Sequence, residues 1–304
     1  MLTIRRILFP TDFSDGAARA FPQAAHLADW HDAELHIVHV AGPQDEDDTA
    51  LPVSQDTLQE WLGQPSGSFS LDTLSIVQHQ VESDAPPERL VAYTEDQDID
   101  LVVMGTHGRR GIRRMILGSV TEEVLRKASC PVLTVRSDAE ETPKQAIRRI
   151  LVPVDFSEAS EIAVQHAKEI AQTYGAEIDL LHVVEEVVYP SAYGVEPPYV
   201  PSQDVVARVE KALGTMARED IGYEHVQVSA RIGYAPLTIL DYVESNDIDL
   251  IVLATHGRTG LDRMLLGSVA ERVIRRAPTP VFIVKPDQKS LVPPAKAEAA
   301  ATSE

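Results

Sequence analysis

The chain contains one stretch of sequence twice. Residues 98 to 136 read DIDLVVMGTHGRRGIRRMILGSVTEEVLRKASCPVLTVR, and residues 247 to 285 read DIDLIVLATHGRTGLDRMLLGSVAERVIRRAPTPVFIVK. Of these 39 aligned positions, 23 are identical, and the alignment needs no gap. A second matched pair begins each half, RRILFPTDFS at 5 to 14 and RRILVPVDFS at 148 to 157. A repeat of this length indicates a duplicated domain rather than a short solenoid unit.

The length of the chain agrees with this duplication, because 304 residues are expected to form two domains of roughly 150 residues each. The repeat places a first domain at 1–137, a polar linker at 138–147 and a second domain at 148–286. Residues 287–304 are rich in Ala and Pro, and we expect them to form a disordered tail.

The composition argues against several kinds of partner. Hydrophobic residues make up 44% of the chain and charged residues 24%, as in soluble globular proteins. The formal net charge of −20 predicts no nucleic-acid partner, because phosphate backbones would be repelled. No signal peptide and no apolar run of about 20 residues is visible, so we expect no membrane insertion and a cytoplasmic location. The single cysteine, Cys130, begins an apolar run and is expected to be a buried structural thiol.

Both halves alternate short apolar segments with helical patterns. In the first half, strands are expected at 6–10, 34–40, 74–81, 100–105 and 131–136, and helices from Ser14 to about residue 30, near 54–62, at 87–96 and at 119–128. The second half repeats this order. Such alternation indicates right-handed βαβ units and a doubly wound parallel sheet of five strands in each half, in the order 3-2-1-4-5, with helices on both faces. In that order the ligand crevice lies beyond the carboxyl ends of strands 1 and 4.

The loop after the fourth strand predicts an anion site. Its glycines follow the spacing Gly105-x2-Gly108-x9-Gly118, and Ser119 follows directly. Gly118 and Ser119 open a helix, so backbone N–H groups and the positive end of the helix dipole point into the crevice. We expect a phosphate to bind there, with added hydrogen bonds from the hydroxyls of Ser119 and Thr121.

Four arginines lie in the same loop, and Arg109 is the one that we expect to contact phosphate. The alternative is that these arginines tie the loop to acidic neighbours or to a partner chain. Two histidines, His107 and its equivalent His256, lie in the glycine loops and are expected to brace them. His39 and His182 occupy equivalent positions in apolar strands and are interpreted as core histidines.

The loop after the first strand contains Asp12, in the run Pro10-Thr11-Asp12-Phe13-Ser14. A carboxylate at this place can accept hydrogen bonds from an adenine amine or a ribose hydroxyl. The alternative is an acid at a helix N-terminus that complements the dipole. The sequence TDFS also replaces the G-x-G-x-x-G of dinucleotide-binding domains, and the chain has neither a P-loop nor a G-x-S-x-G elbow.

Together these motifs resemble the universal stress protein family, and both halves look like its domains joined in tandem. The resemblance implies a Rossmann-like fold that often binds ATP, dimerises through its last strand and acts in stress survival. It implies that the adenosine end of the site is lined by Pro10, Thr11, Asp12 and Val40. It further implies that ribose and phosphates are held by Gly105, Gly108, Gly118, Ser119, Val120 and Thr121, with Mg²⁺ accompanying the nucleotide.

The second half departs from this pattern at three positions. Val154 stands where the first half has Thr11, Ala254 replaces Gly105, and Ala270 replaces Thr121. The second half retains Asp155, Val183, Gly257, Gly267 and Ser268. These losses predict that the second half binds ATP more weakly than the first.

We therefore expect an ATP-binding universal stress protein with a regulatory or protective role, and no catalysis beyond slow ATP hydrolysis. The two halves are expected to pair as an intramolecular pseudo-dimer through PVLTVR and PVFIVK, because a β-branched edge strand invites pairing. A homodimer is also allowed. The rival hypothesis is a non-catalytic dimerisation or interaction module whose nucleotide sites are vestigial. A small enzyme of the wider adenine-nucleotide α-hydrolase-like group is a third option, but it needs a Ser/Gly-rich phosphate loop that TDFS does not supply.

Overall fold

The computed structural model describes seven stretches of the chain, 2–42, 51–63, 70–106, 117–136, 146–185, 203–255 and 266–292. Most of the predicted linker and the end of the predicted tail, from residue 293, lie outside these described residues.

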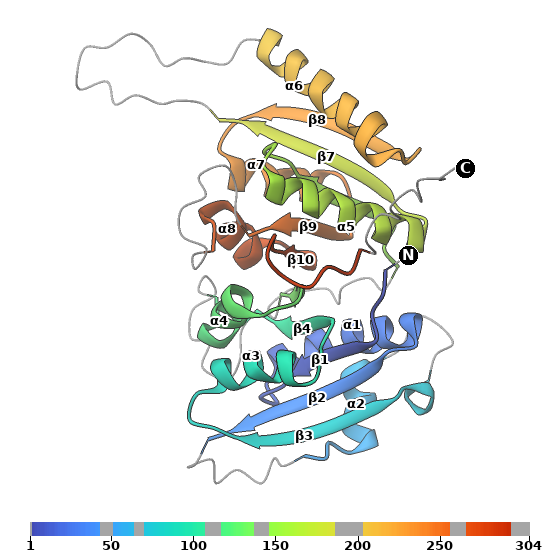
Figure 1. The fold of residues 1–304 in the computed structure, drawn as a ribbon, viewed down its shortest axis with the longest axis vertical. Helices are drawn as coiled ribbons and strands as arrows, with labels where there is room; N and C mark the ends of the chain where they lie inside the picture. Colours follow the sequence, from blue (N-terminus) through green and yellow to red (C-terminus); the bar gives the residue numbers. More distant parts are fainter. Residues whose placement is uncertain are drawn as a thin grey trace, which may run out of the picture.

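The expected order of strands and helices is present in both halves (Figure 1). The elements of the first half are β1 (Arg6–Pro10), α1 (Asp15–His31), β2 (Glu34–Ala41), α2 (Gln55–Leu62), η1 (Leu71–Thr73), β3 (Ile76–Glu82), α3 (Pro86–Asp96), β4 (Leu101–Gly105), α4 (Ser119–Lys127) and β5 (Val132–Val135). Those of the second half are β6 (Arg149–Pro153), α5 (Glu158–Tyr174), β7 (Glu177–Val184), α6 (Gln203–Met216), η3 (Ala217–Ile221), β8 (Val226–Ile232), α7 (Ala235–Ser245), β9 (Leu250–Ala254), α8 (Ser268–Arg276) and β10 (Val281–Val284).

All ten strands form one continuous sheet in the order β3-β2-β1-β4-β5-β10-β9-β6-β7-β8. Each half has the predicted order 3-2-1-4-5 and is parallel throughout. The halves join where β5 and β10 run antiparallel, with Leu133 opposite Phe282. The predicted pairing through residues 131–136 and 280–285 is therefore confirmed, and it merges two five-stranded sheets into one.

Helices cover both faces of this sheet, and each face carries a core that runs through both halves. Helices α1, α2, α5 and α6 pack on one face, around Phe9, Phe21 and Leu213. Helices α3, α4, α7 and α8 pack on the other, around Leu125 and Ile274. Strands covered on both faces read as continuous apolar runs, which is why LVVM and LIVL are apolar at every position.

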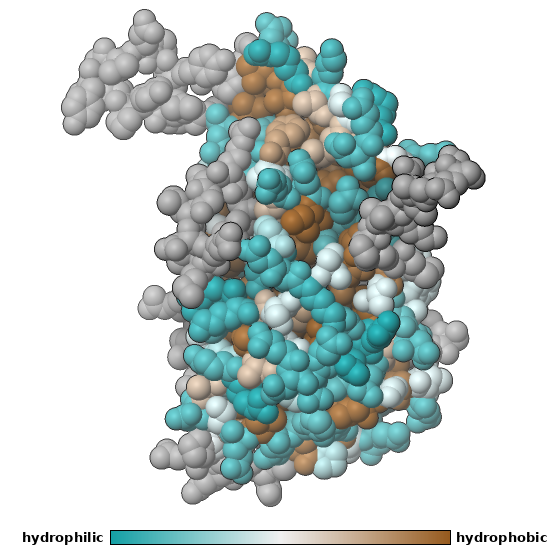
Figure 2. Space-filling model, viewed as in Figure 1, coloured by the Kyte–Doolittle hydropathy of each residue, from teal (hydrophilic) through white to brown (hydrophobic). Residues whose placement is uncertain are grey.

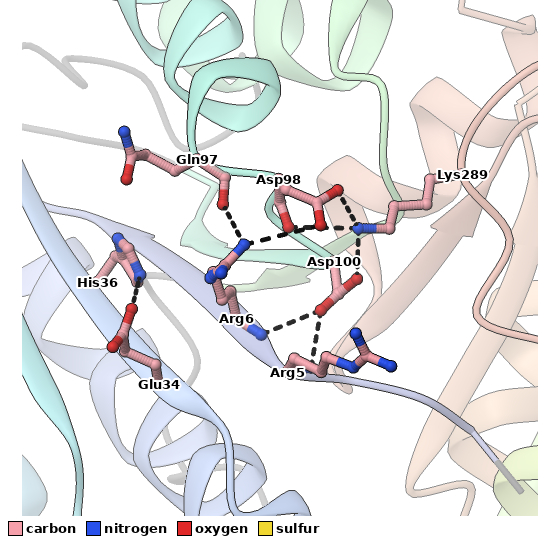
Figure 3. Close-up of polar contacts among 8 residues, drawn as sticks. All are labelled: Arg5, Arg6, Glu34, His36, Gln97, Asp98, Asp100 and Lys289. Carbon is pink, nitrogen blue, oxygen red and sulfur yellow. Dashed lines mark hydrogen bonds and ion pairs between the residues drawn. The ribbon is translucent and has the colours of Figure 1, made fainter.

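The segment after β10 differs from the prediction, which began a disordered tail at residue 287. Residues 287–292 pack back onto the first half instead. The backbone N–H of Lys289 donates to the carbonyl of Ser129 at 2.8 Å, and its ammonium lies 2.6 Å from Oδ1 of both Asp98 and Asp100 (Figure 3). Leu291 is only 2% exposed. The buried Leu291 and the paired Lys289 hold this segment in place. The Ala/Pro-rich composition of 287–304 did not predict either contact.

The surface and the single thiol agree with the composition. In the view of Figure 2, hydrophilic residues cover most of the first half, at the bottom of the picture, as expected for a chain of net charge −20. Within the described stretches, no helix is long and apolar enough to cross a membrane.

Cys130 is buried, and this burial raises the pKa of its thiol to about 12, so it is a structural thiol as predicted.

Candidate functional site

The strand order places the two repeated motifs side by side. Strand β1 lies between β2 and β4, so the chain changes direction at the gap between β1 and β4. Leu8 pairs with Val102 in this register, and both strands run the same way. The turn that begins at Thr11 and the loop that begins at Thr106 therefore leave the sheet at the same edge, where doubly wound sheets bind ligands.

The turn after β1 is held in an unusual conformation. Phe13 has φ of 60°, in the left-handed region that bulky residues rarely adopt. The N–H of Phe13 donates to Oγ1 of Thr11 at 3.0 Å. Oδ1 of Asp12 accepts from the backbone N–H of Ser14 at 3.1 Å and from its hydroxyl at 2.6 Å. Ser14 in turn caps α1 by accepting from the N–H of Ala17. Strain of this kind concentrates at functional sites, where the surrounding contacts enforce it.

The second half repeats this turn almost atom for atom. Phe156 has φ of 61°. Oδ1 of Asp155 accepts from the N–H of Ser157 at 3.0 Å and from its hydroxyl at 2.5 Å. Val154 has no hydroxyl, so the contact that Thr11 makes with the N–H of the following phenylalanine is absent from this turn. The carboxylate of each aspartate thus braces the start of the following helix, as the alternative interpretation predicts, and its contact with a ligand stays a prediction.

The two strand histidines are structural, as the sequence predicts. Nδ1 of His39 lies 2.8 Å from the carbonyl oxygen of Thr11, and Nδ1 of His182 lies 2.6 Å from that of Val154. Because a carbonyl oxygen can only accept, Nδ1 carries the proton in both rings, which fixes the tautomer. The rings also pack on the strained phenylalanines, with centroids 4.7 Å apart for Phe13 and 5.0 Å for Phe156. Each histidine thus stabilises the turn through one hydrogen bond and one ring contact.

Helix α4 begins at the same edge, and its first backbone N–H groups precede the helical hydrogen bonds. Gly118 has φ of −61° and ψ of 138°, and no described side chain caps the helix. Its N–H donates to the carbonyl of Thr106 at 2.9 Å, and the helical hydrogen bonds begin with Glu122 donating to Gly118 at 2.8 Å. The N–H groups of Ser119 and Val120 precede that ladder, and the side chain of Ser119 is exposed. This end of α4 has the geometry of an anion site.

Helix α8 begins in the same way, with Gly267 donating to the carbonyl of Thr255 at 2.8 Å. The φ of Gly118 and of Gly267, −61° and −58°, is open to any residue. What glycine provides at these positions is therefore the absence of a side chain beside the helix start, rather than a left-handed conformation.

Thr121 does not lie as the sequence prediction placed it. Its side chain is only 4% exposed, and its hydroxyl donates to the carbonyl of Gly105 at 3.0 Å. The proton that was expected to reach a phosphate is therefore used inside the protein. In the second half the equivalent pair is Ala254 and Ala270, both buried. Gly105 and Thr121 contact each other, so their replacement by Ala254 and Ala270 in the second half is one change in packing rather than the loss of two ligand contacts.

The remaining predicted residues divide into two groups. Pro10 is buried at the end of β1, and Val40 and Val183 are half-buried near the ends of β2 and β7. Ser268 is exposed at the start of α8. Gly108, Arg109, Gly257, His107 and His256 lie outside the described residues. Sequence reasoning missed the phenylalanines, although the signal was present as the repeated triplet Asp-Phe-Ser.

Comparison with known proteins agrees with this geometry. The model of the universal stress protein family matches the chain twice, over residues 3–136 and 146–285. A universal stress protein of Mycolicibacterium smegmatis is 30% identical over 300 residues, covering 92% of this chain and 97% of its own. One from Mycobacterium tuberculosis is 28% identical over 290 residues, covering 92% and 96%.

The crystal structure of a universal stress protein from Archaeoglobus fulgidus shares the fold, with a TM-score of 0.62 at 21% identity over 92% of this chain and 98% of that one. The two tandem matches cover nearly all of the described residues, so the chain belongs to the universal stress protein family.

Proposed function

We propose that the first half binds ATP, with Mg²⁺, and that nucleotide occupancy gives the protein a regulatory or protective role in the response to stress. The observation that supports this most is the meeting of two features at one sheet edge. The braced Asp12 turn follows β1, and the open N-terminus of α4 follows the adjacent strand β4.

The chemistry of the two features suits the two ends of a nucleotide. The backbone N–H groups of Ser119 and Val120 and the positive end of the helix dipole favour phosphate oxygens. The carboxylate of Asp12 lies in this turn, and a hydrogen bond to it in addition to those from Ser14 would suit an adenine amine or a ribose hydroxyl. No group of three or more metal-ligating side chains occurs in the described stretches. We propose that a Mg²⁺ ion here would be held chiefly by phosphate oxygens and water, as is usual for this ion.

We propose a binding protein rather than an efficient enzyme. The polar groups of the turn are already engaged, because Asp12 holds Ser14 and His39 holds the carbonyl of Thr11. A general base must reach the proton that it removes, and these groups serve the turn instead. The only catalysis that we propose is slow hydrolysis of ATP. We also propose that the protein is cytoplasmic. Any homodimer would use a surface other than β5 and β10, since those strands pair within the chain.

Thermal unfolding with and without Mg-ATP tests this proposal. A ligand at about 100 times its Kd stabilises the folded state by roughly 2.7 kcal/mol, which raises Tm by several degrees. We expect this rise in the wild-type protein. Gly118→Val should abolish it, because the new side chain stands beside the phosphate-binding amides, whereas Gly267→Val at the equivalent position of α8 should preserve most of it. A wild-type Tm that does not respond to Mg-ATP contradicts the proposal.

A different role for the second half has its own support. This half carries Val154, Ala254 and Ala270 in place of the motif residues, yet its strand β10 forms the junction with the first half. We propose that it serves chiefly as the pairing partner of the first half, with a weak or vestigial nucleotide site. Equal nucleotide affinity in both halves would contradict this division.

A further inference from the structure

Each half sends a cation to the end of a helix in the other half. The ammonium of Lys285, directly after β10, donates to the carbonyls of Ala128 at 2.5 Å and Arg126 at 3.3 Å, where α4 ends. The guanidinium of Arg136, directly after β5, donates to the carbonyl of Arg276 at 3.1 Å, where α8 ends. Lys285 and Arg136 are equivalent positions of the repeat, so the two contacts form a reciprocal pair across the junction.

The chemistry of these contacts is that of a helix C-cap. The last carbonyls of a helix have no partner within it and carry the negative end of the dipole, so a cation there is favourable. Burial lowers the pKa of Lys285 to about 8, because the ammonium loses much of its water at this junction. The contact is thus made away from bulk solvent, where it is screened little by salt.

The helices capped in this way are the ones that begin at the candidate phosphate sites. Helix α4 runs from Ser119 to Lys127, so its N-terminal amides and its capped end are separated by about 13 Å of rigid helix. Both helices lie next to the boundary between the halves (Figure 1). A shift of the second half relative to the first would move Lys285 and, through α4, the amides of Ser119 and Val120.

We propose that Lys285 and Arg136 are positioning residues that couple the two halves, each holding the other half's phosphate-binding helix in place. This inference rests on the proposed function, because it concerns the regulation of the same site. It makes the nucleotide affinity of the first half depend on the docking of the second. The effect on α4 is the larger one, since Lys285 reaches two carbonyls of α4 and Arg136 reaches one of α8.

Loss of the cap should move α4 without unfolding it. Val124 and Leu125 of this helix are fully buried in the core of its own half. Packing therefore keeps α4 folded and against the sheet, while its exact position is set by the cap. A second lysine in the same segment, Lys289, offers a matched control, because it carries the same charge but contacts Asp98 and Asp100 rather than α4 (Figure 3).

Calorimetric titration of the full chain with Mg-ATP tests the proposal. We expect Lys285→Met to weaken binding roughly three- to ten-fold, in keeping with the strength of a cation at a helix end. Lys285→Arg should restore affinity to within about two-fold of wild type, because the guanidinium can reach the same carbonyls. Lys289→Met should bind as the wild type does.

Amide hydrogen exchange without nucleotide provides a second readout. We expect faster exchange across 119–127 in Lys285→Met, and wild-type rates in Lys289→Met. If wild type binds Mg-ATP and Lys285→Met matches it in affinity and exchange, the coupling is wrong and the proposed function stands. If wild type does not bind Mg-ATP but exchange in α4 still rises in Lys285→Met, the proposed function is wrong and the coupling of the halves stands. If wild type does not bind Mg-ATP and Lys285→Met has wild-type exchange rates in α4, both the proposed function and the coupling are wrong.

Discussion

The backbone N–H of Leu291 donates a hydrogen bond to Nε2 of His166 at 3.4 Å, which joins the end of the described chain to helix α5. Nδ1 of His166 lies 2.9 Å from the carbonyl oxygen of Ile162 and donates to it. The imidazole is therefore neutral, with its proton on Nδ1 and its lone pair on Nε2 facing Leu291. Protonation at Nε2 would remove the acceptor and leave a charge in a buried place.

This relationship predicts that the free energy of unfolding falls in mild acid. Burial lowers the pKa of His166 below 6.5, and burial also lowers the pKa of His26, His31 and His36. Below pH 6.5 the unfolded chain binds more protons than the folded one, so stability present at pH 7 is lost as the pH falls. Urea unfolding between pH 5 and pH 8 measures this slope.

The matched variants are His166→Gln and His225→Gln. We expect the first to reduce the slope, because one of the four histidines with a lowered pKa is gone. The second removes an exposed histidine and should leave the slope unchanged. A slope that is the same in all three proteins would show that His166 is protonated equally in the folded and unfolded chains.

A second prediction concerns the segment 287–292. Leu291 is buried against both halves' shared core, so Leu291→Ala should lower the free energy of unfolding by about 2–5 kcal/mol. Deleting 287–304 should destabilise the protein at least as much, because it also removes Lys289 from Asp98 and Asp100. Deleting only 293–304 leaves these contacts in place and should cost less than the longer deletion. Denaturant unfolding of the three variants decides the matter, and equal stability of the two deletions would contradict it.

A third prediction contrasts equivalent arginines of the two halves. Asp179 is 0% exposed and accepts from Nε of Arg149 at 3.0 Å and from the hydroxyl of Tyr242 at 3.0 Å. The first half has His36 at this position, and Arg6 reaches outward to the carbonyl of Gln97 at 3.0 Å (Figure 3).

Arg149→Met would leave a buried carboxylate without its cation and should destabilise the protein by about 3–5 kcal/mol. Arg6→Met removes only partly exposed contacts and should cost about 1 kcal/mol or less. Chemical denaturation of both variants gives the comparison, and similar losses in the two would refute the assignment of a buried pair to the second half alone.

A fourth prediction follows from the net charge of −20. Self-repulsion of the acidic surface destabilises the compact state at low ionic strength, and salt screens it. We expect Tm to rise between low salt and about 1 M NaCl. A flat or falling Tm would contradict this prediction. It would mean that salt weakens attractive ion pairs, such as the exposed pair of Lys289 with Asp98, at least as much as it weakens the repulsion between acidic residues.

The fold could be predicted because its signals are local and repeated. Continuous apolar runs such as LVVM mark strands covered on both faces, and Ser14 and Ser157 cap the helices that the sequence pattern starts after them. The duplication then supplied the pairing of β5 with β10, since two equivalent edge strands meet most simply on a twofold axis.

The parts that could not be predicted depend on where single side chains point. Thr121 carries a hydroxyl in a phosphate-like motif, but its place on the inner face of α4 turns that hydroxyl toward Gly105. Phe13 adopts a positive φ, which the conformational preference of phenylalanine does not predict. Leu291 is one apolar residue in an Ala/Pro-rich segment, and only the three-dimensional fold brings it to His166. Such contacts join residues far apart in sequence, which periodicity does not report.

The most direct test of the account is a calorimetric titration of the full chain with Mg-ATP, because it counts the sites and compares the halves. Of the three changed pairs, Thr11 and Val154 differ by a buried hydroxyl in the turn after β1, which accepts from the N–H of Phe13 and can still donate its own proton. One hydrogen bond to a ligand contributes roughly 1–3 kcal/mol, and 1.4 kcal/mol is about ten-fold in affinity. Ser14→Ala serves as the control, since it loosens the helix cap while keeping the Asp12 carboxylate.

We predict one tight site per chain, lost in Asp12→Ala and kept in both Asp155→Ala and Ser14→Ala. Two equal sites per chain, or loss of the tight site in Asp155→Ala alone, would contradict the placement of the nucleotide in the first half.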